Sequence, residues 1–471
     1  KSGAHTHTTS TMKEVAPART VVNTIIIGGG HAGVNLACML ELENTNNNNS
    51  NNISNDYLIL ERSQSLLDKW RHHRWQGFQL NTPVLFTRLH GQKDTREDWL
   101  LDRPLADDLQ GWDDHIRELK VLERTRLNSN VVEVKPLADR GTFETIVAVA
   151  AAGDQDSSTT IHHYYESKNV VVCNGLNDRN IVPTSGLLLA DGNALPDSIK
   201  QHTSAGFKIQ DLNPGNVLVV GSSQSGVQLS QILVEKLATS DDATTKVFLS
   251  CSSAGGVPRS FRGRDVYYWL HRNKFLYITK EALATMPPEK ARALRYGGSG
   301  SPVTGPNRAM SPFSLERQGV TLLGRFKGFQ NGALLFKGDR AESLQLAKAG
   351  HDKFVGMLRD FATTVEAEGE DFPPEEPEAE WEVTNESLLS DPGSLSLDLK
   401  QSGITNILWT RGWSSNLDFL DKHIDQTGKD FDPVTHLPSQ IVSEQYPGLF
   451  FAGYPWVGTI QSMNILAMDR D

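Results

Sequence analysis

Apolar residues and glycine turns alternate in two parts of the chain, and each part predicts a strand, a turn and a helix. Residues 21–27 form a β-branched apolar run that ends in three glycines, and residues 31–42 carry apolar side chains at helical spacing. Residues 216–220 begin the same pattern again, with a glycine-containing turn at 221–226, a helix and a returning strand at 246–250. The chain therefore contains two βαβ openings.

Shorter apolar runs complete the expected architecture. Residues 57–60 form the strand after the first helix, and the asparagine-rich residues 44–55 before it are typical of a surface insertion. The apolar runs at 169–173 and 407–410 each end at a glycine turn, where we expect the chain to cross between domains. A last strand is expected at 449–452. Together the pattern predicts an α/β fold with two Rossmann-like dinucleotide-binding domains.

Composition and charge exclude several classes of protein. The 471 residues are 38% hydrophobic and 22% charged, which is typical of a globular protein with two or three domains. No apolar run approaches the length of a membrane span, and no signal peptide opens the sequence, so we expect a cytoplasmic protein without a membrane segment. The net charge of -11 argues against a nucleic-acid partner.

Cysteine and histidine positions exclude two further kinds of site. Cys38, Cys173 and Cys251 are too few and too scattered for a disulfide framework, and none forms a C-x-x-C pair, so we expect no redox-active dithiol. The histidine pairs at 72–73 and 162–163 lack a third ligand at metal spacing, so no metal site is predicted. The acidic, proline-containing residues 365–381 are interpreted as a solvated loop.

The glycine-rich loop at residues 28–33 (GGGHAG) matches the dinucleotide fingerprint G-x-G-x-x-G. Its first glycine permits the tight turn, its second lets a pyrophosphate approach the backbone, and its third lets the helix pack closely on the strand. Glu61 ends the next strand, where a carboxylate can accept hydrogen bonds from ribose hydroxyls. It follows Gly28 by 33 positions, or by 21 once the twelve residues 44–55 are set aside, against a usual spacing of about 20. The predicted cofactor contacts of this loop are Gly28, Gly30, His31, Ala32 and Gly33.

A second loop, residues 221–226 (GSSQSG), reproduces the fingerprint with serine in place of the middle glycine. The strand that follows ends at Ser250, where a site for NADH would carry an acidic residue. Arg259 and Arg262 come after it, and guanidinium groups suit a 2′-phosphate, so the site favours NADPH. The predicted contacts of this loop are Gly221, Ser222, Ser223, Gln224, Ser225 and Gly226.

Two dinucleotide sites in one chain are most economically explained by a flavoprotein in which NADPH reduces FAD. We predict a tail at residues 1–19, an FAD domain built from 20–200 and 396–471, and an NADPH domain at 201–395 inserted into it. An assembly of identical copies is left open.

Several longer runs resemble the class B flavin-containing monooxygenases, especially the YUCCA-like and related bacterial single-chain flavoproteins. The runs cover nearly the whole chain from residue 20 onward. They are residues 25–33, LERS from 60, WRHHRWQGFQLNTP from 70, VLVVGSSQSG from 217, VPRSFRGRDVYYWL from 257, GVTLLGR from 319, ILWTRGW from 407 and GLFFAGYPW from 448.

The resemblance implies roles for individual residues. Glu61 and Arg62 would hold the FAD adenosine, and Trp70 and Arg71 would lie along the flavin or its diphosphate, although Trp70 fits a core position equally well. Asn81 stands at the position of the family's active-site asparagine, beside the flavin and NADP⁺. A neutral amide can support an oxygenated flavin without adding charge. Near the C-terminus, residues 458–463, with Gln461, would begin a helix directed at the flavin.

The sequence also departs from the family pattern. The monooxygenase fingerprint F-x-G-x-x-x-H-x-x-x-[FYW] is broken around His202, because Phe207 comes one position late and Pro196 and Ser198 replace the expected Phe and Gly. Arg411 is unexpected in the strand end Thr-Arg-Gly, where the family carries Ala-Thr-Gly.

The predicted function is therefore an FAD- and NADPH-dependent monooxygenase. The resemblance implies that a C4a-hydroperoxyflavin oxygenates a small molecule, with dioxygen as co-substrate, at nitrogen or sulfur or at a carbonyl or α-keto acid. One alternative keeps the fold and both cofactors but makes the protein an NADPH oxidase or a reductase of quinones. The other is a flavin-binding regulatory protein without turnover.

Overall fold

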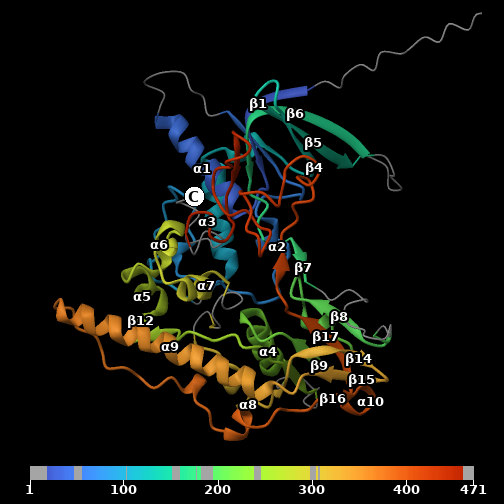
Figure 1. The fold of residues 1–471 in the computed structure, drawn as a ribbon, viewed down its shortest axis with the longest axis vertical. Helices are drawn as coiled ribbons and strands as arrows, with labels where there is room; N and C mark the ends of the chain where they lie inside the picture. The colour runs from blue at the N-terminus through green and yellow to red at the C-terminus, as the bar shows by residue number, and fades with distance from the viewer. Residues whose placement is uncertain are drawn as a thin grey trace, which may run out of the picture.

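The computed structural model contains two α/β units stacked along its long axis, each built around its own sheet (Figure 1). In Figure 1 the sheet with β1 lies above the sheet with β9. The structure describes residues 19–46, 56–101, 103–150, 160–176, 178–181, 195–237, 245–296, 304–305 and 308–459. The predicted tail at 1–19, apart from its last residue, and most of the asparagine-rich insertion lie outside these ranges.

The first sheet combines a parallel half with an antiparallel half. Its order is β3-β2-β1-β6-β5-β4, and β19 pairs with the C-terminal end of β6. The pairings among β3, β2, β1, β6 and β19 are parallel, whereas β6, β5 and β4 pair antiparallel. The strands are β1 (Arg19–Ile27), β2 (Tyr57–Leu60), β3 (Thr125–Arg126), β4 (Asn130–Leu137), β5 (Thr142–Ala150), β6 (Thr160–Val172) and β19 (Leu449–Phe451).

The second sheet is entirely parallel, with the order β13-β10-β9-β17-β8. Because helices and loops cover parallel sheets on both faces, their strands are apolar throughout. Accordingly, β10 is buried at all four positions and β9 at four of five. The strands are β8 (Lys200–Thr203), β9 (Asn216–Val220), β10 (Val247–Ser250), β13 (Thr321–Leu323) and β17 (Ile404–Trp409).

Both sheets place their first βαβ strand at the point where the strand order reverses. β1 lies between β2 and β6, and β9 lies between β10 and β17. Ligands of open α/β sheets bind at such reversals, outside the carboxyl ends of the strands. The mixed α/β architecture with parallel sheets is therefore confirmed, while the assignment of each sheet to a dinucleotide stays a prediction.

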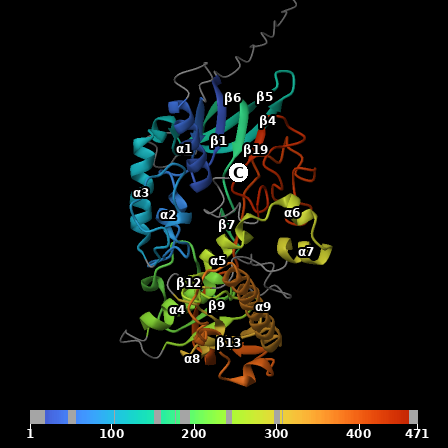
Figure 2. The same ribbon diagram turned by 90° about the vertical axis from the view of Figure 1, so that its left-hand side faces the viewer.

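The predicted helices form close to their expected positions. α1 (His31–Asn46) follows the first glycine loop, and α4 (Gln224–Leu237) follows the second. Figure 2 shows α3 flanking the first sheet, and α6 and α7 beside the middle of the molecule. The remaining helices are α2 (Asp68–His72), α3 (Leu105–Glu118), α5 (Val266–Arg272), α6 (Lys280–Ala284), α7 (Pro288–Tyr296), α8 (Pro312–Arg317), α9 (Arg340–Ala367) and α10 (Leu399–Ser402).

The predicted end of the inserted domain at residue 395 is too early. β16 (Ser396–Asp398) pairs with β15 (Ala333–Phe336), which also pairs with β14 (Phe326–Gln330), and β17 lies inside the second sheet. The chain therefore belongs to the second unit as far as Trp409 and rejoins the first sheet only at β19. Near this return, β18 (Trp413–Ser414) pairs with β7 (Arg179–Asn180), so both connections between the units run side by side.

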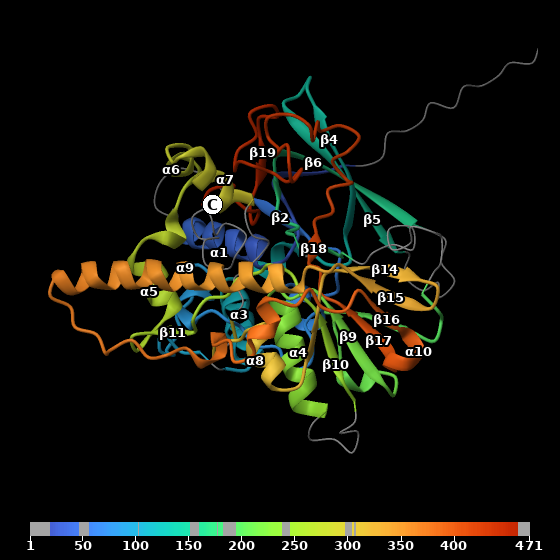
Figure 3. The same ribbon diagram turned by 60° about the horizontal axis from the view of Figure 1, so that its bottom comes forward.

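Most of the acidic stretch at 365–381 is exposed, as predicted for a solvated loop, but two aromatic side chains within it are buried. It continues from the end of α9 and runs back beside that helix, as Figure 3 and Figure 1 both show. We name residues 368–382 the acidic strap. Phe372 and Trp381 anchor it, because both side chains are buried. Trp381 stacks on His351 of α9 with ring centres 4.4 Å apart and ring planes within 5°.

Candidate functional site

The three fingerprint glycines of the first loop meet different surroundings. Gly28 has a φ of +105°, and a Cβ there would lie 2.9 Å from the carbonyl oxygen of Cys173. A Cβ on Gly33 would lie 2.0 Å from the carbonyl oxygen of Gly28, so the helix can approach the strand only without one. A Cβ on Gly30 would meet no atom within 4 Å. Packing thus requires two of the glycines, while Gly30 faces open space.

Glu61 braces this loop from the end of β2. Its Oε2 accepts a hydrogen bond from the Gly29 N–H at 2.6 Å, and its Oε1 accepts from the Ser63 N–H at 2.7 Å. The carboxylate is buried, and each oxygen keeps a second lone pair for a further donor.

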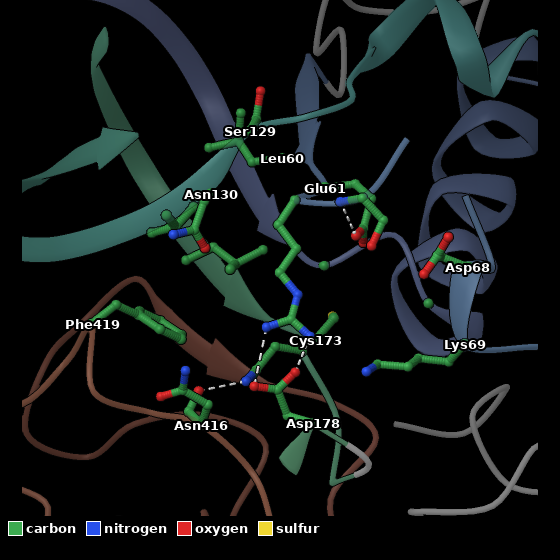
Figure 4. A pocket seen from close by; sticks show the side chains of 17 residues that line it. Leu60, Glu61, Asp68, Lys69, Ser129, Asn130, Cys173, Asp178, Asn416 and Phe419 are labelled. Carbon is green, nitrogen blue, oxygen red and sulfur yellow. Dashed lines mark hydrogen bonds and ion pairs between the residues drawn. The ribbon is translucent and has the colours of Figure 1, made fainter. Parts of the chain in front are cut away.

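A pocket opens between the first loop, the end of β2 and the chain that returns to the first sheet (Figure 4). It brings together four of the predicted contacts, Gly28, Gly30, Glu61 and Arg62. The Arg62 guanidinium forms an ion pair with Asp178 within it. The other members of its lining include Asp68, Lys69, Ser129, Asn130, Cys173, Asn174, Asp178, Asn416 and Phe419.

Lys69 gives the pocket a second cation. Burial lowers the pKa of its ammonium group, and the positive charge of Arg62 lowers it further. Lys69 and Asp178 were not predicted as site residues. The sequence signal for Asp178 is weak: it lies three residues after the glycine turn at Gly175, on a connection between the two units.

Two predicted contacts, Trp70 and Arg71, lie outside the lining of this pocket. Trp70 packs edge-on against Trp112, with ring centres 6.0 Å apart. Arg71 donates to the carbonyl oxygen of Leu66 at 2.9 Å and forms an ion pair with Asp113. These contacts favour the core interpretation of Trp70 and hold Arg71 against α3.

The second glycine loop repeats the geometry of the first. Gly221 has a φ of +112°, and a Cβ on Gly226 would lie 1.7 Å from its carbonyl oxygen. Ser223 occupies the place that Gly30 has in the first loop. Ser222 is fully buried, and its hydroxyl accepts from the Ser252 N–H at 2.7 Å, which ties the loop to the segment after β10. Gln224 and Ser225 begin α4.

The structure gives both predicted phosphate-binding arginines other partners. Arg259 is buried and donates to Asp265 at 2.5 Å, while Arg262 pairs with Glu366 and donates to the carbonyl oxygen of Pro373 at 2.8 Å. Burial raises the pKa of Asp265 and so disfavours its charged form. The positive charge of Arg259 acts in the opposite direction and favours the carboxylate. Neither guanidinium is therefore presented to a 2′-phosphate in this structure.

Asn81 is one of the residues through which the two units are hydrogen-bonded to each other. Its Oδ1 accepts from Gln228 Nε2 of α4 at 3.0 Å, and its carbonyl oxygen accepts from Arg259 at 2.9 Å. Gln228 is itself buried and donates to the carbonyl oxygen of Thr304. In the described part of the chain, no hydrogen bond engages Asn81 Nδ2, so its donor is free for a ligand. Sequence reasoning missed Gln228, because a glutamine in the first turns of a helix carries no signal of its own.

The comparisons with known proteins show the fold. No protein-family model and no curated protein matches the sequence. Solved structures do match the chain in fold. Among them are a flavin-containing monooxygenase from Stenotrophomonas maltophilia, with a TM-score of 0.52, and a double mutant of a flavin monooxygenase from that organism, with a TM-score of 0.54. Each is 13% identical in sequence, and each match covers 96% of both chains. The chain has the flavin-containing monooxygenase fold. The predicted resemblance is thus confirmed at the level of the fold.

Some residues singled out from the sequence lie outside the lining of the first pocket, or outside the described ranges. His202 lies on β8, where its ring is 3.2 Å from Asn406 Oδ1 and packs edge-on against Phe207, and burial lowers its pKa. Arg411 is exposed just beyond the carboxyl end of β17. Gln461 lies outside the described residues.

Three predicted absences can be compared with the described residues. Among those residues, no group of three His, Cys, Asp or Glu side chains could hold a metal ion. All three cysteines are buried and lie outside any disulfide, and burial raises the pKa of Cys251 to about 12. No helix in the described ranges is both long enough and apolar enough to cross a membrane.

Proposed function

We propose that this protein is an FAD- and NADPH-dependent monooxygenase of small molecules. One atom of dioxygen would enter the substrate and the other would leave as water, with NADPH and a proton supplying the remaining electrons and hydrogen. The observation that carries the proposal is the first pocket. It combines an open Gly30, a braced Glu61 and two cations on the fold of flavin monooxygenases.

The residues of this pocket fit FAD. The open space at Gly30 lets a diphosphate approach the loop and the N-terminus of α1, where helix N–H groups favour an anion. The free lone pairs of Glu61 suit ribose hydroxyls. Lys69 lies in the same lining and can contact a phosphate oxygen, while Asp178 holds the Arg62 guanidinium at the edge of the ribose site.

NADPH would bind at the second loop. The proposal is supported by the repeated turn geometry of Gly221 and Gly226, and by a strand end at Ser250 that carries no acidic side chain against a 2′-phosphate. Since Arg259 and Arg262 are engaged elsewhere, they carry no part of this preference.

Asn81 would act as a neutral donor beside the reacting centre. When bound, FAD would supply the redox chemistry by which NADPH activates dioxygen. The chain's task is to orient and shield that chemistry. Gln228 and Arg259 fix Asn81 between the units and leave its Nδ2 to donate without adding charge.

The substrate class follows from this chemistry only in outline. Electrophilic oxygen transfer suits a nucleophilic nitrogen or sulfur, and nucleophilic transfer suits a carbonyl or an α-keto acid.

The test is to load the protein with FAD and follow NADPH oxidation, dioxygen uptake and product mass with panels of thioethers, amines, ketones and α-keto acids. Incorporation of one atom of ¹⁸O₂ into a product supports the proposal. NADPH oxidation without incorporation for any panel would contradict it.

The competing function is an NADPH oxidase or quinone reductase on the same fold. It is favoured by His202, a residue of the broken fingerprint that lies on β8, at the edge of the second sheet. There its ring contacts Asn406 and Phe207. Stoichiometric release of hydrogen peroxide per NADPH with every panel, or rapid reduction of a quinone without dioxygen, would favour this alternative.

A further inference from the structure

Arg74 lies at the seam between the two units. Its guanidinium carbon is 4.0 Å from the ring centre of Trp70 and 5.1 Å from that of Phe78. Trp70 packs against the core that contains α1, and Phe78 packs against that core and against the core of the second sheet. The next residue, Trp75, is buried in the second core. The cation thus lies against two neighbouring aromatic rings, whose centres are 6.2 Å apart, where the units meet.

Backbone hydrogen bonds connect this segment to both units. The Leu67 N–H donates to the carbonyl oxygen of Gly29 at 2.8 Å, which ties the start of α2 to the first glycine loop. At the other end, the Gln76 N–H donates to the carbonyl oxygen of Phe207 at 2.9 Å. The segment that carries Arg74 is therefore hydrogen-bonded to the first glycine loop before Arg74 and to the second unit after it.

No carboxylate neutralises Arg74 in the described part of the chain. Its Nε is buried and has no hydrogen-bond partner there. Burial alone lowers the pKa of the Arg74 guanidinium to about 10, so it remains charged at neutral pH. The other arginines of this region behave differently, since Arg62, Arg71 and Arg259 are each paired with an aspartate.

An unpaired, partly desolvated cation is costly, and stacking on aromatic rings offsets only part of that cost. The guanidinium fork matches the oxygens of a phosphate. We propose that Arg74 binds a phosphate group of one of the two dinucleotides, an inference that rests on the proposed function. The phosphate would belong to FAD or to NADPH, because these are the phosphate-bearing ligands that the function brings to the two loops joined by this segment.

The experiment compares Arg74→Met and Arg74→Lys with the wild-type chain. Arg117→Met is the matched control, because Arg117 lies on the surface of α3 and pairs only with Asp114. Dissociation constants are measured for FAD on the apoprotein and for NADP⁺ on the FAD-loaded protein, and Tm is measured without added ligand. None of these readouts requires turnover.

We expect Arg74→Met to raise the dissociation constant of one of the two ligands by about 10- to 100-fold, which is the usual effect of losing a hydrogen-bonded charge. Arg74→Lys should lose less, since it keeps the charge without the fork. The ligand that responds identifies the source of the phosphate. Without ligand, Tm of Arg74→Met should not fall, because no hydrogen bond or ion pair is lost and the methionine side chain can still pack on Trp70 and Phe78.

Unchanged dissociation constants for both ligands in Arg74→Met would overturn the inference. A fall in the ligand-free Tm of Arg74→Met, together with full ligand binding by Arg74→Lys, would also overturn it. If the wild-type chain binds both ligands but transfers no oxygen, the proposed function fails while the role of Arg74 stands. If the wild-type chain binds neither, both fail.

Discussion

At the scale of single residues, the first glycine loop separates binding from packing. The Cβ of Gly33 would overlap the carbonyl oxygen of Gly28, whereas the Cβ of Gly30 would project into open space. The fingerprint alone predicted both roles, because turn, approach and packing follow from the spacing of the glycines. It could not predict that Glu61 also braces the loop through the Gly29 N–H, which depends on the exact placement of two strands.

Two substitutions test this separation. Gly30→Ala should leave the Tm of the apoprotein unchanged and abolish FAD retention, because the methyl group occupies space needed by the pyrophosphate. Gly33→Ala should instead cost about 1–3 kcal/mol of the free energy of unfolding, since the helix must shift away from the strand. Thermal unfolding and flavin content of both variants measure the effects. Full flavin occupancy in Gly30→Ala would refute the cofactor assignment.

Arg259 was predicted from sequence as a phosphate ligand and is found in a buried ion pair with Asp265. Arg259→Met leaves that carboxylate buried without its cation, so we expect a loss of about 3–5 kcal/mol in the free energy of unfolding at neutral pH. Burial already raises the pKa of Asp265. As pH falls, the carboxylate of Asp265 is protonated in the folded variant at a higher pH than in the unfolded chain. The loss in the free energy of unfolding should therefore shrink as pH falls below neutral. Urea unfolding at pH 7 and pH 5 measures it, and a deficit that grows on acidification would contradict the assignment.

Gln228 tests the role of Asn81. Gln228→Leu removes the hydrogen bond to Asn81 Oδ1 and should lower the yield of oxygenated product per NADPH by about tenfold, with the lost turnover appearing as hydrogen peroxide. Gln228→Glu keeps an acceptor but removes the donor, so it should resemble Gln228→Leu. The control is Gln231→Leu on the same helix, which does not contact Asn81. Equal coupling in all four proteins would mean that Asn81 needs no support from α4.

At the scale of elements, the acidic strap shows where sequence patterns stop being informative. Its charges and prolines indicated a solvated loop, and most of its residues are exposed, but the buried side chains of Phe372 and Trp381 pack it against α9 and neighbouring segments. Its partners lie about a hundred positions earlier in the chain: Arg272 pairs with its glutamates 368 and 370, and Arg262 donates to its backbone carbonyls at 372 and 373. Contacts of such separation leave no local period, so the sequence could not predict them. Strands such as β2 and β9 were predicted at their full length because short apolar runs between turn residues carry a local signal.

The strap should owe its attachment to the aromatic side chains and not to its ion pairs. Trp381→Ala should cost about 3–5 kcal/mol of the free energy of unfolding. Neutralising Glu368, Glu370 and Glu375 to glutamine should change Tm little, because exposed ion pairs are screened by water and salt. Thermal unfolding of the two variants at low and high salt measures the difference. A larger loss in the charge variant would reverse this order.

At the scale of the whole molecule, the order of elements and the insertion of one unit into the other follow from the two glycine loops. The predicted boundary at residue 395 failed because β16 and β17 resemble the strands of either unit, and only their pairing assigns them. The candidate site behaved likewise. Its loop residues were predicted from local motifs, whereas Gln228, Lys69 and Arg74 could be identified only from their contacts in the folded structure.

The central claim is that NADPH, FAD and dioxygen react in sequence on this chain. The most direct measurement reduces the FAD-loaded protein with NADPH in the absence of air, mixes it with oxygenated buffer and follows the flavin spectrum. The account predicts bleaching by NADPH and then a long-lived C4a-hydroperoxyflavin with NADP⁺ still bound. Failure of NADPH to bleach the flavin, or direct return of the reduced flavin to its oxidised spectrum, would contradict it.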